Sequence, residues 1–331
     1  MEIQIYCDAL QEGEWFRKIS PYFKNAKVEK IKPRGKNLTI IDNLIEYDRP
    51  DIILLINDRV VFALEKTEEV PTGHNVGQRF ARIVRSIELN IPFIYFCPFV
   101  AMKHGKYANK CFINARLLKA VEKMEYIHKV PILVMNWISD KDYELIRTGA
   151  EDSELKELID SIIKVNFIFQ KSKFFYKLKE KMKIEYSKRI KSFQNYKLPP
   201  NTVKFIKTED FIRSLKSFDV KFSDRFMNNE ETLIYTIGMT SSNCRREDPF
   251  TGTQLVYDYL WCRNGTKISD RYRNLVLNIP FVTKDRWLEA NPNETGKKRH
   301  LYYTVPDLIK LSDGVILTEH IRFDNPQKRL I

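Results

Sequence analysis

Long apolar runs are missing from this sequence. A membrane-spanning helix needs about 18 consecutive apolar residues, and no stretch of the 331 residues reaches that length. The first residues, MEIQIYCDALQEGEW, carry acids where a secretory signal peptide has a basic region followed by an apolar one. We therefore expect a cytoplasmic protein that has no membrane partner.

The cysteine and histidine spacings of zinc-binding modules are missing as well. No two cysteines form a CxxC pair, and no pair of histidines follows at the spacing of a structural zinc site. An odd, scattered set of thiols is typical of reduced cysteines. The five are Cys7, Cys97, Cys111, Cys244 and Cys262.

Acidic residues are too few to balance the basic ones. The chain has 56 Lys and Arg against 43 Asp and Glu, which gives a net charge of +13. Such a surplus attracts polyanions, and nucleic acid is the commonest of these in the cytoplasm. A lysine-rich solvated surface is the alternative reading.

The order of apolar segments predicts an α/β fold over residues 1–165. Helical spacing is present at 12–24, 73–90, 114–127 and 152–165, and strands are expected at 37–48, within 49–69, at 91–99 and at 130–137. The first strands are close enough to pair antiparallel, whereas helices separate the later, parallel ones. We expect a mixed central β-sheet flanked by helices.

Two further regions follow this predicted domain. Residues 166–200 read as a basic helical connector that ends before Pro199-Pro200. Lys171 and Lys173 in it are candidate DNA contacts, although a solvated basic face would have the same sequence. Residues 201–331 alternate short helices and strands, which predicts a second α+β domain. Its polar loops, with Arg263 as a candidate, are of the kind that contact DNA.

The stretch RPDIILLINDRVVFALEKTEE (49–69) places two carboxylates in one predicted hairpin. Asp51 stands at the start of the first strand and Glu65 near the end of the second. With a two-residue turn at Asn57-Asp58 or Asp58-Arg59, both fall at the same end of the sheet. Two such carboxylates repel unless a cation lies between them, and hard oxygen ligands favour Mg²⁺.

Pro50-Asp51, the turn and Glu65 after the apolar VVFAL resemble the PD-(D/E)xK nuclease superfamily, and more specifically type II restriction endonucleases. The following helix and the strand IPFIYF fit the order of that core. The resemblance implies a restriction endonuclease-like core and Mg²⁺-dependent hydrolysis of phosphodiester bonds in double-stranded DNA at a specific sequence. Asp51 and Glu65 would be the metal ligands, and the C-terminal domain would recognise DNA. Because cutting both strands needs two active sites, we expect a homodimer.

The third motif residue differs from the family pattern. A lysine is expected two positions after the acid, but Thr67 stands there and the lysine is Lys66. Either a bulge after Glu65 turns Lys66 into the site, or Thr67 occupies the position of the motif lysine and a residue of the next helix performs the function of that lysine. Gln78, Arg79 and Arg82 are the helix candidates, and the two arginines are also candidate DNA contacts.

Two other functions remain possible from the sequence. One is a defence or repair nuclease acting on RNA or single strands, and the other is a nucleic-acid-binding protein whose nuclease fold has lost activity. Pro306-Asp307, followed by Glu319, mimics the motif. Because the first strand would be short and no lysine follows in place, we interpret it as part of a strand pair in the second domain.

Overall fold

The chain folds into two compact units with separate sheets. The computed structural model describes residues 2–104, 108–193, 202–242, 244, 259, 262–263, 271–290, 303 and 305–318, with the backbone alone at 73–78, 116, 191–193 and 202. The first unit is formed by residues 1–75 and 82–196, and the second by 76–81 and 197–331.

The first unit is built on a six-stranded mixed sheet with the order β2-β1-β3-β4-β5-β8. The β1–β3 and β3–β4 pairs are antiparallel, whereas the β1–β2, β4–β5 and β5–β8 pairs are parallel. The predicted change from antiparallel to parallel pairing is confirmed. The strands are β1 (Ile3–Cys7), β2 (Lys27–Lys30), β3 (Ile52–Ile56), β4 (Arg59–Lys66), β5 (Phe93–Cys97) and β8 (Ile132–Asn136).

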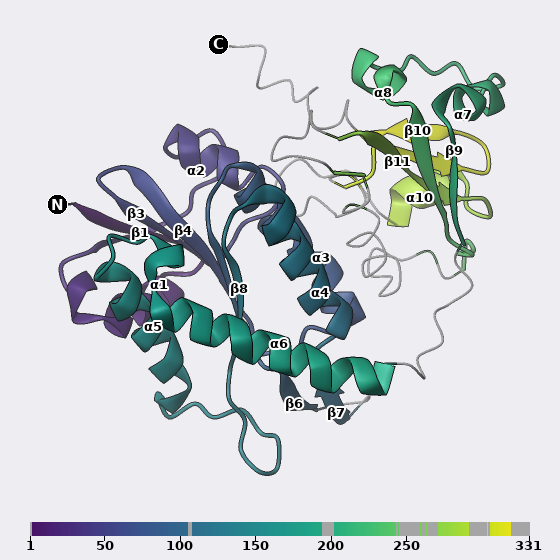
Figure 1. Ribbon diagram of the computed structural model, residues 1–331. Helices are drawn as coiled ribbons and strands as arrows, with labels where there is room; N and C mark the ends of the chain where they lie inside the picture. Colours follow the sequence, from purple (N-terminus) through teal and green to yellow (C-terminus); the bar gives the residue numbers. More distant parts are fainter. Residues whose placement is uncertain are drawn as a thin grey trace. The chain divides into compact units, whose positions relative to one another are not determined.

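Helices cover both faces of this sheet (Figure 1). The connections β4–α3–β5 and β5–α4–β8 step in the same direction, and right-handed crossovers therefore place α3 and α4 on one face. Helices α1, α5 and α6 pack on the other face, where alternate strand residues form the main core with them. The helices are α1 (Leu10–Ile19), α2 (Thr39–Leu44), α3 (Gly73–Glu88), α4 (Ala115–His128), α5 (Ser153–Ile163) and α6 (Lys173–Phe193), and a small hairpin is formed by β6 (Val100–Lys103) and β7 (Asn109–Phe112).

The β3–β4 hairpin turns at Asn57-Asp58, one of the two expected positions. Asn57 and Asp58 have φ values of 47° and 61°, and two consecutive left-handed residues define the type I′ turn that matches the twist of paired strands. The pairing runs from Ile56 opposite Arg59 to Ile52 opposite Leu64, with one register shift between Leu54 and Leu55.

The strand predicted at 37–48 is wrong, because this segment contains helix α2. Its β-branched residues favour a strand locally, but tertiary contacts determine the outcome. Arg85 of α3 donates a hydrogen bond to the carbonyl of Asn43 (2.7 Å) and pairs with Glu46 (2.6 Å). The missing antiparallel strand is β1, formed by the N-terminal residues.

The basic segment forms helix α6 as part of the first unit. Phe174, Phe175 and Leu178 are buried in the main core, whereas Lys173 and Lys177 are exposed. The helix therefore uses its apolar face to pack on the unit and presents Lys173 and Lys177 to solvent. Among the described residues, no helix has the length and apolar character needed to cross a membrane.

The second unit has a five-stranded mixed sheet with the order β13-β12-β11-β10-β9. β10 and β11 pair in parallel, as do β11 and β12, whereas both edge strands pair antiparallel. The VPDLIKLSDGVILTEHIRF segment contains the predicted strand pair, β12–β13. The elements are β9 (Thr202–Lys207), α7 (Thr208–Ser214), α8 (Asp224–Asn228), β10 (Glu231–Thr236), β11 (Arg273–Ile279), α10 (Lys284–Ala290), β12 (Leu308–Leu311) and β13 (Val315–Leu317).

Gly13 allows α1 to lie close to the sheet, and its replacement by alanine should destabilise the first unit. A Cβ at this position would lie 2.5 Å from Cγ1 of Val28 and 2.7 Å from Sγ of Cys7. We expect Gly13→Ala to lower the free energy of unfolding by about 1–3 kcal/mol, as overpacking does, when measured by urea denaturation.

Gly238→Ala is the matched control, because a Cβ there has no neighbour within 4 Å. Its free energy of unfolding should stay within about 1 kcal/mol of the wild type. Similar stability of both variants would show that α1 does not depend on the close approach at Gly13.

Candidate functional site

Asp51 and Glu65 converge at one end of the first sheet. Asp51 directly precedes β3 and Glu65 is the next-to-last residue of β4. Since Ile52 pairs with Leu64, extending the register by one position places the two carboxylates opposite each other. The exposed fractions of Asp51 and Glu65 are 8% and 2%. The hairpin thus holds two buried acids side by side, as its sequence pattern predicts.

Arg82 of α3 supplies the positive charge between these acids. Its Nη1 contacts Oε2 of Glu65 and lies 3.5 Å from Oδ1 of Asp51, while its Nε donates to Oδ2 of Asp48 at 2.7 Å. The other oxygen of Asp51, Oδ2, accepts a hydrogen bond from the backbone N–H of Lys66 at 2.7 Å. One guanidinium therefore connects three carboxylates.

The cluster has less positive than negative charge. Burial, with the charge of Glu65 as the second cause, raises the pKa of Asp51 to about 9, although Arg82 and the N–H of Lys66 act in the opposite direction. Burial alone would lower the pKa of Arg82, but Glu65, Asp48 and Asp51 raise it well above its ordinary value. At neutral pH we therefore expect a protonated Asp51 beside a permanently charged Arg82.

Glu12 belongs to the same end of the sheet. It lies in the first turn of α1, and its Oε2 accepts a hydrogen bond from the N–H of Ala9 at 3.3 Å. Burial raises the pKa of Glu12, and the charge of Glu65 adds to this effect. Sequence reasoning missed Asp48, because nothing local links it to a helix that begins 25 positions later.

Lys66 lies on the opposite face of the sheet from Glu65. β4 has no bulge between Glu65 and Lys66, which pair with Tyr95 and Phe96 of β5. The ammonium group lies 4.1 Å from the ring centre of Trp15 and 4.8 Å from that of Trp137. This geometry is a cation–π contact with two indoles, and it directs the lysine away from the two acids.

Thr67 occupies the face of Glu65 but has a local partner. The side chain is buried, and its hydroxyl accepts a hydrogen bond from the N–H of Glu69 at 3.1 Å. This contact is typical of a residue that fixes the turn after a strand. The position that carries lysine in the resembling family therefore holds a turn-stabilising hydroxyl here.

The remaining predicted site residues lie elsewhere or outside the described side chains. The side chain of Gln78 is outside the described part, and Arg79 is half-buried on α3. Lys171 and Lys173 are exposed beside the start of α6, in a groove between α5 and α6. Arg263, in the second unit, is only 2% exposed, and its guanidinium carbon lies 5.5 Å from the ring centre of Tyr259.

The donor atoms of Asp51 and Glu65 fit Mg²⁺. This ion is usually held by one or two carboxylates, with water and substrate phosphates completing its shell. Within the described ranges, no group of three or more His, Cys, Asp or Glu is arranged to hold a metal. A cation would also add positive charge beside Asp51, whose pKa is raised by burial and then by the charge of Glu65.

Comparison with protein-family models, with curated proteins and with solved structures finds no match for this chain. Any functional assignment therefore depends on the geometry of Asp51, Glu65 and Arg82 and on the charge of the chain.

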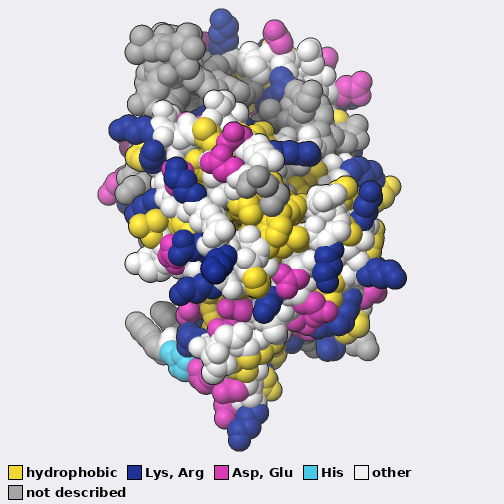
Figure 2. Space-filling view, turned by 90° about the vertical axis from the view of Figure 1, so that its left-hand side faces the viewer, with side chains coloured by type: hydrophobic (Ala, Val, Ile, Leu, Met, Phe, Trp, Pro, Cys, Tyr) yellow, Lys and Arg dark blue, Asp and Glu magenta, His cyan; other side chains and the backbone are white. Residues whose placement is uncertain are grey.

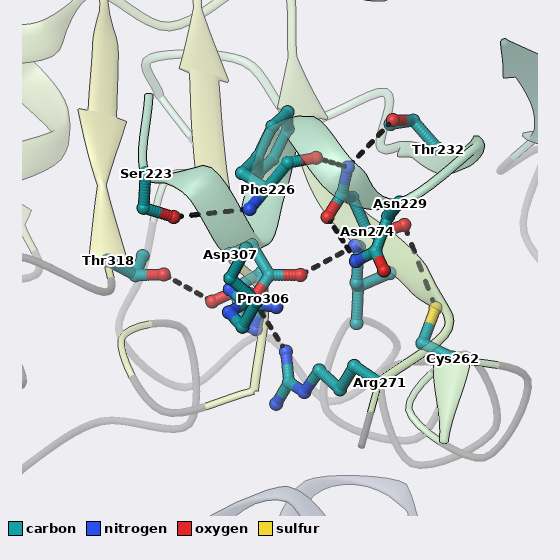
Figure 3. A network of polar contacts seen from close by, with 12 residues as sticks. Ser223, Phe226, Asn229, Thr232, Cys262, Arg271, Asn274, Pro306, Asp307 and Thr318 are labelled. Atoms are coloured by element: carbon teal, nitrogen blue, oxygen red, sulfur yellow. Dashed lines mark hydrogen bonds and ion pairs between the residues drawn. The ribbon is translucent and has the colours of Figure 1, made fainter. Parts of the chain in front are cut away.

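The second Pro-Asp pair of the sequence has a structural role. Asp307 is fully buried, and its Oδ1 accepts hydrogen bonds from Arg225 (2.7 Å) and Arg271 (2.8 Å) (Figure 3). Its Oδ2 accepts from the N–H of Leu275 at 2.8 Å. Glu319, the second acid of this look-alike, lies outside the described residues. Asp307 thus anchors β12 to β11 and to two arginines.

Asp51 should make the stability of the first unit depend on pH. Its pKa is about 9 in the folded protein against 3.8 ordinarily, so the folded state keeps a proton that the unfolded chain releases between these values. The free energy of unfolding should therefore fall as pH rises from about 4 to 9, by at most about 1.4 kcal/mol per pH unit from this group. Asp51→Asn should remove this contribution, as urea denaturation at several pH values would measure.

The difference between the wild type and Asp51→Asn reports on this group and on the groups coupled to it, because the titrations of distant groups cancel. Asp8→Asn serves as the control, since it removes a half-exposed carboxylate near the same end of the sheet. Parallel pH profiles for the wild type and Asp51→Asn would show that Asp51 is ionised in the folded protein.

Asp307→Ala should destabilise the second unit strongly. The substitution removes the carboxylate that Arg225 and Arg271 share in a buried environment, and breaking such a pair costs roughly 3–5 kcal/mol. Asp210→Ala breaks the exposed pair with Arg213 and should cost less than about 1 kcal/mol. Thermal denaturation would compare them, and equal losses would contradict the structural role of Asp307.

Proposed function

We propose that this protein is a Mg²⁺-dependent endonuclease that hydrolyses phosphodiester bonds in double-stranded DNA at a specific sequence, as type II restriction enzymes do. The proposal rests on the convergence of Asp51, at the start of β3, with Glu65, at the end of β4. The order of strands around them and the net charge of +13 support it. The first unit would be a PD-(D/E)xK-like nuclease core and the second would contact the recognised sequence.

Asp51 and Glu65 would hold the metal, which lowers the pKa of a bound water and neutralises charge that builds on the phosphate. Asp51 would enter this state by losing the proton that its raised pKa otherwise retains. The hydrogen bond from the N–H of Lys66 to Oδ2 fixes the orientation of the Asp51 carboxylate. Since that bond uses Oδ2, Oδ1 would be the oxygen left for a cation.

Arg82 would perform the function of the motif lysine of PD-(D/E)xK nucleases. It would release its Nη1 contact with Glu65, keep its Nε bond to Asp48 and turn the free end of the guanidinium toward the scissile phosphate. A guanidinium has five donors in one plane, so one edge can stay anchored while the other binds. Lys66, held by Trp15 and Trp137, would take no direct part.

A catalytically inactive nucleic-acid-binding protein is the second candidate function. The observation in its favour is Arg82 itself, because its guanidinium lies where a metal would neutralise Asp51 and Glu65. In that reading the ion cluster only stabilises the sheet, and Arg82 never leaves it. A homodimer belongs to the first proposal, since cutting both strands requires two sites.

A cleavage assay separates these functions. Supercoiled plasmid should be cut by the wild type in Mg²⁺ and left intact in EDTA. Asp51→Asn and Glu65→Gln should each lower the rate by at least about 100-fold, as loss of a group that stabilises transition-state charge does. Glu68→Gln is the matched control, because Glu68 is exposed and pairs with Arg147, and its rate should equal that of the wild type.

Cleavage that survives both Asp51→Asn and Glu65→Gln would refute the site. DNA binding without cleavage in Mg²⁺ or Mn²⁺ would establish the inactive binding protein instead. The same assay on single-stranded DNA and on RNA tests the substrate, and a preference for either would replace the restriction reading with a nuclease of defence or repair.

A further inference from the structure

A lysine-lined groove lies between α5 and the start of α6. It has a volume of about 780 Å³ and is open to solvent. Its wall has five lysines and only two acids, Glu157 and Asp160. The lysines are Lys156, Lys164, Lys171, Lys173 and Lys177. In the face drawn in Figure 2, basic and acidic side chains are interspersed.

The lysines of the groove have no counter-ions within the described part of the chain. No ion pair involves any of the five, whereas Lys181 and Lys183 of the same helix pair with Glu154 and Glu180. Asp160 accepts a hydrogen bond at 2.6 Å from the hydroxyl of Ser20, which is not among the residues that line the groove. The surplus positive charge therefore remains available to an external anion.

The position of these lysines is unfavourable for the isolated unit. The first turn of α6 contains no acid, and Lys171 and Lys173 instead lie at the positive end of the helix dipole, where cations are destabilising. Lys156, Lys164 and Lys177 add to the mutual repulsion. An anion bound in the groove would reverse the sign of both contributions.

We propose that this groove binds backbone phosphates of the DNA, a proposal that rests on DNA being the substrate. All five lysines are exposed, and exposed flexible ammonium groups are typical of backbone contacts. A small phosphate compound is usually held by a few convergent donors in an enclosed pocket, and this groove is open. The chemistry of the ligand is the phosphate group in either case, and a polymer fits the shape better.

The groove is separate from the carboxylate cluster. Glu12 in the first turn of α1 is near Glu65, whereas Ser20, which follows the last residue of α1, binds Asp160 at the groove. The ten residues of α1 span about 15 Å. The groove therefore contacts phosphates away from the scissile one, and it adds affinity without taking part in the chemistry.

Equilibrium binding of a fluorescent DNA duplex in EDTA tests the groove, because no cleavage occurs there. Lys171→Gln/Lys173→Gln should weaken binding at least about 10-fold at 50 mM salt. The plot of log K against log salt should become shallower by about 1.8, the value for two lost phosphate contacts. Lys183→Gln/Lys188→Gln, with the same change of charge on the same helix, should change the affinity less than about 2-fold. Circular dichroism verifies that both double variants are folded.

Equal losses of affinity in the two double variants would overturn the proposal that the groove binds DNA, since the change of charge alone would then explain the effect. Inorganic pyrophosphate is the competing ligand. The nucleic-acid assignment would be overturned if pyrophosphate bound the wild type through Lys171 and Lys173 without changing the affinity for the duplex. If the lysine variants bind the duplex as the wild type does but Asp51→Asn still abolishes cleavage, the groove proposal fails and the proposed nuclease function stands. A wild type that binds no DNA refutes both proposals.

Discussion

The end of the first sheet depends on the contacts of the Arg82 guanidinium with the buried carboxylates. Two buried carboxylates that face each other repel, and Asp51 and Glu65 are placed in this way by the register of β3 and β4. α3 brings one cation to them, and Asp48 fixes that cation through Nε. Because burial disfavours the ionised form of Asp51 and one guanidinium does not neutralise three carboxylates, we expect Asp51 to keep a proton. The result is a folded site that additional positive charge would stabilise.

The hairpin that presents the two acids was predictable because its signals are local. Alternation of apolar residues fixes the faces of the strands, and Asn57-Asp58 adopts the left-handed conformations that a two-residue turn needs. The strand predicted at 37–48 failed for the opposite reason. Helix α2 depends on contacts with Arg85, about 40 positions further along the chain, and no local window of sequence contains that information.

The same distinction applies to the site. Glu65 stood out because a carboxylate inside an apolar strand needs a partner, but the partner itself was not identifiable. Arg79 and Arg82 were equivalent candidates on the sequence of α3, and only the packed fold brings Arg82 to the acids. Strand alternation does place Lys66 opposite to Glu65. The indole of Trp15 that receives Lys66 comes from α1, which lies far away in sequence.

The first unit separates its charges along α1. Glu12 at the beginning of this helix belongs to the carboxylate end, and Ser20 after its last turn binds an acid of the lysine groove. The carboxylate cluster would repel a polyanion until a cation arrives, whereas the groove would attract it without any metal. Binding would then depend on salt through the groove, and chemistry on pH and Mg²⁺ through Asp51. A nuclease built in this way would hold DNA before its active site is complete, so that assembly of the metal site, and not encounter with DNA, would decide when the strand is cut.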